Sequence, residues 1–179
     1  MASPKRRQLA LDILVGLMAI VALSFVVRER LVPWIAERSV VDPGEAVREA
    51  PALLDARTGD SLLFRRDAHN LLLVFRSTCP TCEQTAPAWT RLSTSAEWLT
   101  TAIGLEDPEG AASYARVHLP AARVAVPADI DRFTRRFRIG VVPTTLVIDR
   151  GGRLVARHAG PLEESDIETL RGLTASSTP

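Results

Sequence analysis

The chain has 179 residues, of which 46% are hydrophobic and 24% charged, a composition typical of one globular domain rather than of a disordered chain. The formal net charge of +1 argues against a nucleic-acid-binding protein, which needs a marked basic excess. The two cysteines, Cys79 and Cys82, lie together in the sequence, which excludes a secreted scaffold held by several disulfides.

An apolar stretch near the N-terminus predicts a transmembrane anchor. Residues 9–27 are apolar apart from Asp12, and as a helix they rise about 28 Å, close to the hydrocarbon thickness of a bilayer. Basic residues 5–7 precede this stretch, so we expect residues 1–8 to form a cytoplasmic tail and the folded part to lie on the other side of the membrane. A cleavable signal peptide is the alternative, although its apolar region is normally shorter.

The rest of the chain divides into a linker, a domain and a tail. Residues 28–50 are polar, contain Pro33 and Pro43, and predict a juxtamembrane linker. Residues 51–173 form the predicted domain, and residues 174–179 a flexible tail.

Strand-like and helix-like patterns alternate along the domain. The predicted strands are Leu53–Leu54, Ser61–Phe64, Leu71–Phe75, Leu99–Leu105, Arg123–Val126, Thr144–Asp149 and Arg153–His158. The predicted helices are residues 80–92, Pro108–Val117, Asp129–Phe137 and Ser165–Leu173. This alternation, ending in a hairpin and a helix, predicts an α/β fold with a mixed β-sheet flanked by helices on both faces.

The motif Cys79-Pro80-Thr81-Cys82 carries the predicted chemistry. It follows a buried strand and opens a helix, so the Cys79 sulfur should face unpaired backbone N–H groups and the positive end of the helix dipole. That field favours a thiolate, the form that attacks a partner disulfide, and Cys82 would then resolve the mixed disulfide. We therefore predict that Cys79 and Cys82 are catalytic and that Pro80 and Thr81 contact the substrate.

Two other interpretations of the cysteine pair remain open at this point. A structural zinc site needs two further ligands, whereas there is no third cysteine and the histidines His69, His118 and His158 are scattered singly. A purely structural disulfide would close so short a loop that it would constrain the unfolded chain little. We therefore expect neither a metal nor a bound cofactor.

Two separate segments resemble the thioredoxin superfamily. Residues 75–87 resemble its active-site strand and helix, including a proline five residues after the second cysteine, and residues 138–144 resemble its segment that ends in a cis-proline. Residues 149–152 and 160–162 resemble its closing hairpin and the turn after it, so that the match spans roughly residues 50–173. Together with the anchor and an extra βα element, the chain resembles the TlpA/ResA-like branch of membrane-anchored thioredoxins. That resemblance implies a thioredoxin-like domain that is anchored to the bacterial inner membrane and faces the periplasm.

The same resemblance implies a role for Pro143. A cis bond there would present the backbone of Val142 beside the sulfurs, where an extended substrate pairs strand to strand. The alternative is a proline that simply begins an edge strand. Two positions depart from the family pattern, because Leu73 replaces a buried acid and Thr78 replaces a tryptophan. No proton acceptor for Cys82 can therefore be carried over.

The leading hypothesis is a membrane-anchored thiol–disulfide oxidoreductase that acts on protein partners outside the cytoplasm and exchanges electrons with an upstream redox donor. A role in cytochrome c maturation is implied by the family resemblance alone. The alternative is an anchored copper(I) chaperone that uses the cysteine pair and a distal histidine such as His158, since soft sulfur ligands suit Cu(I). A peroxidase of the same fold is a third and less favoured hypothesis. The direction of exchange stays open.

Overall fold

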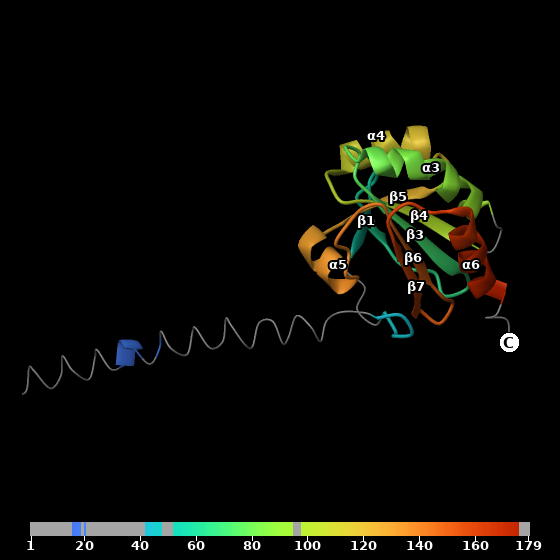
Figure 1. Ribbon diagram of the computed structural model, residues 1–179. Coiled ribbons are helices and arrows are strands. Elements are labelled where there is room, and N and C mark those ends of the chain that lie inside the picture. The colour runs from blue at the N-terminus through green and yellow to red at the C-terminus, as the bar shows by residue number, and fades with distance from the viewer. Residues whose placement is uncertain (1–15, 19, 21–41, 48–51, 95–97, 176–179) are drawn as a thin grey trace, which may run out of the picture. The chain divides into compact units, whose positions relative to one another are not determined.

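The computed structural model describes residues 16–18, 20, 42–47, 52–94 and 98–175 (Figure 1). The chain divides into two units, Met1–Val40 and Val41–Pro179, and the folded domain belongs to the second. Residues 16–18 and 20 are helical, and the rest of the predicted anchor, the predicted cytoplasmic tail and most of the predicted linker lie outside the described residues. Within the part that is described, no helix is both long enough and apolar enough to cross a membrane.

Seven strands form one mixed sheet in the order β2-β1-β5-β4-β3-β6-β7. Their bounds are β1 Leu53–Asp55, β2 Ser61–Leu62, β3 His69–Phe75, β4 Trp98–Gly104, β5 Arg123–Pro127, β6 Thr144–Ile148 and β7 Leu154–Ala159. Strands β3, β4 and β5 are parallel to one another, while β1, β6 and β7 pair antiparallel with their neighbours. The mixed sheet predicted from the sequence is confirmed.

Helices cover both faces of this sheet, as predicted (Figure 1). They are α3 Pro80–Ser93, α4 Pro108–His118, α5 Ile130–Arg136 and α6 Glu164–Ala175. All residues of the central strand β3 are buried, so helices must cover the sheet on both of its faces. Leu71, Leu73 and Phe75 pack with α3, α4 and α6, whereas Leu72 and Val74 pack on the opposite face with α5.

A close approach at the end of β4 fixes the position of α4. The N-cap residue Asp107 accepts a hydrogen bond from the backbone N–H of Gly110 at 2.9 Å, and Pro108 occupies the first turn. A side chain at Gly104 would overlap the Cβ of Ala111, so only glycine lets the helix lie this close to the strand. The carboxyl ends of β3 and β4 are therefore covered by the first turns of α3 and α4.

The structure differs from the sequence prediction at two segments near the edges of the sheet. Residues 42–47, predicted as linker, pair with the start of β7. The Gly44 N–H donates to the Leu154 carbonyl at 2.6 Å, and the Leu154 N–H donates to the backbone carbonyl of Glu45 at 3.0 Å. Strand β2 ends at Leu62 rather than Phe64, and Leu63 is exposed. Both segments are too short to carry a periodic pattern, so their partners decide their structure.

Candidate active site

The cysteine motif lies at the junction between β3 and α3. Strand β3 ends at Phe75, and the helix begins at Pro80, which has no N–H to leave unpaired. Cys79 is the N-cap residue with an extended backbone, and its sulfur accepts a hydrogen bond from the Cys82 N–H at 3.1 Å. The Cys79 N–H donates to the carbonyl of Arg76 at 3.2 Å, closing a tight turn. The sulfur thus occupies the place where an N-cap oxygen would lie, as the sequence predicts.

The two sulfurs differ in exposure. Both cysteines are free thiols; Cys79 is partly exposed, whereas Cys82 is fully buried. Burial, aided by the hydrogen bond with Cys79, raises the pKa of the Cys82 thiol from 9.0 to about 12. Cys82 therefore stays protonated at neutral pH. Leu73, where the family carries an acid, lies in the same apolar cluster as Cys82 and offers no proton acceptor.

The segment before β6 comes next to the exposed sulfur. The Val142–Pro143 peptide bond is cis, and the Cys79 thiol donates to the Val142 carbonyl at 3.7 Å. Pro143 is buried, Pro80 is exposed, and Thr81 and Val142 are partly buried. Because β6 lies between β3 and β7, the alternative of a proline that begins an edge strand is wrong. The fold therefore brings Val142 and Pro143 beside Cys79, while Pro80 and Thr81 follow Cys79 in the first turn of α3.

A carboxylate that sequence reasoning missed holds the loop before Cys79. Ser77 donates to Glu106 twice, from its backbone N–H at 2.7 Å and from its hydroxyl at 2.6 Å. Glu106 follows β4, the parallel neighbour of β3, and the carboxyl ends of such strands meet at one edge of the sheet. That rule points to the region after Gly104, but not to one particular acid in it.

Tyr114 is the second residue that the sequence reasoning missed. Its ring stacks on Phe75 with 4.5 Å between centroids, and its buried hydroxyl has no hydrogen-bond partner among the described residues. Burial raises the pKa of Tyr114, and negative charge at Cys82 or Cys79 would raise it further, which puts the hydroxyl within electrostatic reach of the cysteine pair. Helical spacing alone marks it as a core residue, so the sequence carries no signal for this placement.

No metal centre accompanies the cysteines in the part of the chain that is described. There, no three His, Cys, Asp or Glu side chains lie close enough together to hold a metal ion. His158, the histidine considered for copper, contacts the Pro161 carbonyl at 3.0 Å and the Asp166 carboxylate at 3.7 Å. His69 and His118 pack against aromatic rings. The chemistry that the described site offers is that of a dithiol.

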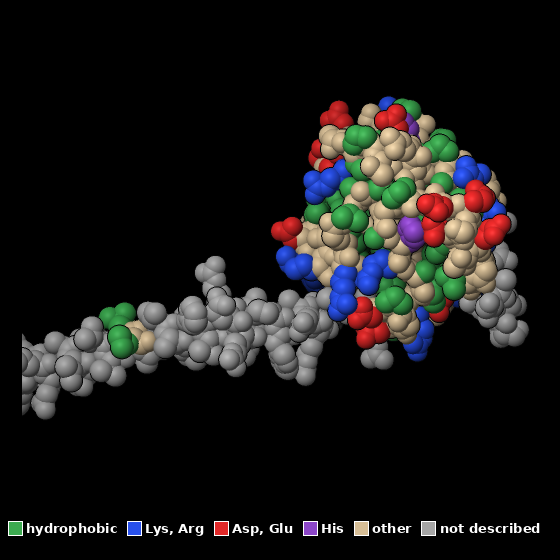
Figure 2. Space-filling model, viewed as in Figure 1, with side chains coloured by type: hydrophobic (Ala, Val, Ile, Leu, Met, Phe, Trp, Pro, Cys, Tyr) green, Lys and Arg blue, Asp and Glu red, His purple; other side chains and the backbone are tan. Residues whose placement is uncertain are grey.

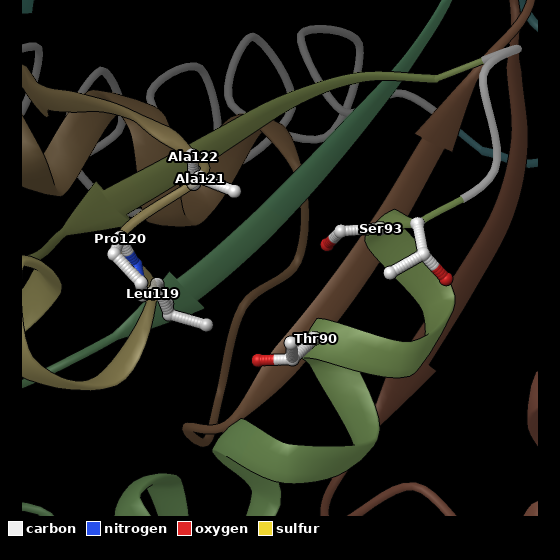
Figure 3. A pocket seen from close by; sticks show the side chains of 7 residues that line it. Thr90, Ser93, Leu119, Pro120, Ala121 and Ala122 are labelled. Carbon is white, nitrogen blue, oxygen red and sulfur yellow. The ribbon is translucent and has the colours of Figure 1, made fainter.

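Two hollows differ in their relation to this dithiol. The first, which we name the Arg76 groove, measures about 370 Å³ and is lined by Arg76, Leu105, Thr134, Ile139, Gly140, Val141 and Val142. The second measures about 100 Å³ and lies between the end of α3 and the loop after α4 (Figure 3). Thr90, Ser93, Thr94 and residues 119–122 line it, with no thiol or titratable side chain among them. Only the first hollow adjoins the cysteines.

A mixed sheet with helices on both faces, a dithiol at the start of a helix and a cis-proline beside it define a thioredoxin-fold protein. No family model matches the chain. The chain is 30% identical over 125 residues to a thiol:disulfide interchange protein, a DsbE homolog from Paracoccus denitrificans (strain Pd 1222), and the match covers 66% of this chain and 69% of that protein. The chain therefore belongs to the DsbE family of thiol:disulfide interchange proteins.

Solved structures show the same fold. A thio-disulfide isomerase from Thermus thermophilus is 23% identical with a TM-score of 0.61, and the match covers 78% of this chain and 99% of that one. The thioredoxin domain of a thiol-disulfide oxidoreductase from Bacteroides vulgatus is 13% identical with a TM-score of 0.63, covering 74% of this chain and 98% of that one. The predicted superfamily is confirmed, and the TlpA/ResA-like branch is consistent with these relatives. The protein is a thiol–disulfide oxidoreductase.

Proposed function

We propose that this oxidoreductase is anchored in the bacterial inner membrane by residues 9–27, faces the periplasm and exchanges disulfides with protein partners. The observation that carries the proposal is the asymmetry of the two sulfurs: Cys79 is reachable and lies beside the Val142 carbonyl, whereas Cys82 is buried behind it. The apolar stretch with its preceding basic residues supports the anchor.

The exchange proceeds in two steps at the cysteine pair. The Cys79 thiolate attacks one sulfur of a partner disulfide; the partner's S–S bond breaks, and its other sulfur leaves as a thiolate. Cys82 then loses its proton and attacks the Cys79 sulfur, which releases the second partner thiol and leaves a Cys79–Cys82 disulfide. Two electrons have passed to the partner, and an upstream dithiol donor returns them. The reverse sequence oxidises a partner dithiol.

The substrate contacts follow from what surrounds the reacting sulfur. An extended partner segment would pair with the backbone at Val142 and Pro143, while Pro80 and Thr81 flank it on the helix side. Hydrogen bonds to the main chain hold the segment independently of its sequence, so one site can serve several partners. The kinship with a DsbE homolog supports, within this proposal, a role in cytochrome c maturation.

Trapping of the mixed disulfide tests the proposed chemistry. The Cys82→Ser variant of the full chain, expressed in its host, should accumulate a disulfide-linked adduct with a partner protein, because the resolving thiol is gone. Cys79→Ser is the matched control and should trap little. Equal trapping by the two variants, or none by either, would contradict the assignment of roles.

Topology and metal content test the other parts of the proposal. A periplasm-dependent reporter fused after Pro179 should be active, and residues 9–27 should be present in the mature protein. After anaerobic purification with copper, we expect no stoichiometric metal. Bound Cu(I) that disappears in His158→Ala would instead favour the copper chaperone.

A further inference from the structure

Two of the residues that line the Arg76 groove are hydrogen-bonded to Cys79. One is Val142, whose carbonyl accepts the Cys79 thiol at 3.7 Å. The other is Arg76, whose carbonyl accepts the Cys79 N–H at 3.2 Å. A polypeptide segment that delivers its cysteine sulfur to Cys79 therefore has this groove immediately beside it.

One positive charge lines the groove. Arg76 is the only ionisable residue among its lining side chains, and the guanidinium is exposed. The Arg76 guanidinium makes no hydrogen bond or ion pair with any other described residue, unlike the guanidinium groups of Arg138 and Arg157, which both pair with Asp42. An unpaired guanidinium at a hollow can bind a carboxylate through two parallel hydrogen bonds.

Hydrogen bonds to the residues before and after Arg76 hold the loop that carries it. Glu106 accepts two hydrogen bonds from Ser77, and the Leu105 N–H donates to the Phe75 carbonyl at 3.0 Å. The Glu106 carboxylate is thus directed at Ser77. The backbone of Arg76 is fixed relative to the Cys79 sulfur, so less flexibility is lost when the side chain meets a ligand.

The lining of the groove combines polar and apolar surface in about equal parts. Leu105, Ile139 and Val141 contribute aliphatic side chains, and 56% of the Val141 surface is exposed. Acidic and basic side chains are otherwise interspersed over the face of the domain seen in Figure 2, which argues against attraction of a partner by one broad field. Selectivity at this site is therefore local, set by one charge and a few aliphatic contacts next to the sulfur.

We infer that the Arg76 groove selects partner segments that carry an aspartate or glutamate, together with a small aliphatic residue, close to the target cysteine. The carboxylate pairs with Arg76, and the aliphatic side chain packs on Val141 and Ile139. This inference rests on the proposed role of Cys79 as the attacking sulfur and adds the substrate class that this sulfur prefers.

Three matched peptides test the inference with the reduced full chain in detergent. Each contains one cysteine capped as a disulfide with 2-mercaptoethanol, one neighbouring valine and, two residues from the cysteine, Asp, Asn or Lys. The second-order rate constant should be about 5- to 10-fold higher for the Asp peptide than for the Lys peptide at low salt, with the Asn peptide between them. The difference should shrink at 0.5 M NaCl, since the pair is partly exposed.

Variants of one residue separate this preference from general activity. Arg76→Glu should reverse the order of the three peptides, and Arg76→Gln should abolish the preference without reversing it. Arg123→Glu is the control, because Arg123 is exposed at the opposite, amino end of the parallel strands and should keep the wild-type order. Circular dichroism checks that each variant is folded. If Arg76→Glu does not fold, the loss of preference in Arg76→Gln tests the inference instead.

The outcomes distinguish the inference from the function on which it rests. Equal rates for the three peptides in the wild type, or an unchanged order in Arg76→Glu, would overturn the groove's selectivity while leaving the oxidoreductase intact. Failure of the wild type to reduce even the Asn peptide, or activity that survives Cys79→Ser, would instead overturn the role of Cys79.

Discussion

The surroundings of Cys79 and of Cys82 are built on different physical principles, although only two residues separate the sulfurs in the chain. Around Cys79 the backbone is exposed and is held by hydrogen bonds between distant segments, such as the loop at Ser77 and the carboxylate of Glu106. Around Cys82 the surroundings are apolar: the thiol is fully buried and shares its cluster with Leu73 and Phe75.

This difference supports the proposed division of tasks between the two sulfurs. The outer sulfur is partly exposed, so in the proposed exchange it is the one that can meet a partner and release it. Burial keeps the inner sulfur as a thiol, and in the proposed exchange it loses its proton only when it attacks the mixed disulfide. A site with two equally exposed thiols would lack this order of events.

The largest effect should be in thiol reactivity. At pH 8, Cys79 in the Cys82→Ser variant should react with iodoacetamide at least ~100-fold faster than Cys82 in Cys79→Ser, because each unit of pKa removes a factor of ten in thiolate. Burial holds the pKa of Cys82 above 9.0, so its rate should keep rising with pH well beyond that value. Mass spectrometry of timed samples measures both rates. Comparable rates would contradict the difference in thiol reactivity between Cys79 and Cys82.

We call the surroundings of Cys82 the inner half of the site and those of Cys79 the outer half. Gly104→Ala should disturb the inner half more than the outer half. The new methyl group would overlap Ala111 and push α4 away from β4, at a cost of about 1–3 kcal/mol in the free energy of unfolding. Gly172→Ala in α6 is the control; its Cβ would have open space, so the change should be neutral or stabilising. Urea unfolding measures both, and equal stability of the two variants would contradict the close packing of α4.

The outer half of the site was the easier half to predict from the sequence, because its main determinants are local. An apolar strand, an N-cap position, a proline at the first helical turn and the two-residue spacing of the sulfurs all lie between Leu71 and Cys82. The resemblance to a known family supplied Pro143, which no local pattern would have revealed. The fold class followed from the alternation of strands and helices.

Contacts between distant segments account for what the sequence did not reveal. Glu106 meets Ser77 across 29 residues, and many exposed acids in the chain look the same in sequence. Tyr114 reads as an ordinary core residue of α4, and residues 42–47 read as linker until β7 provides a partner. In each case the side chain or strand acquires its role only from tertiary structure.

Glu106→Gln should loosen the outer half without unfolding the inner half. One of the two hydrogen bonds from Ser77 loses its acceptor, because an amide nitrogen only donates, and the other loses its charge. We therefore expect a loss of about 1 kcal/mol in stability, moderated because the pair is partly exposed. The alkylation rate of Cys79 should change by about two- to fivefold, while Cys82 stays unreactive. Glu168→Gln, an exposed position on α6, serves as the control. If Glu106→Gln leaves both quantities as in the control, the carboxylate does not position the loop.

The smallest effect is expected at Tyr114. Its buried hydroxyl has no hydrogen-bond partner among the described residues, so Tyr114→Phe removes an unsatisfied polar group and should raise stability by up to about 1 kcal/mol. The stacked contact with Phe75 is kept, and the reactivity of Cys79 should not change. Calorimetry measures the stability, and the rate at which Cys82 resolves a mixed disulfide on Cys79 gives a second readout. If that rate falls while stability rises, the hydroxyl assists ionisation of Cys82, and the inner half contains a polar group that acts in the exchange. If stability falls instead, the hydroxyl is hydrogen-bonded in solution, and the inner half is less apolar than its packing indicates.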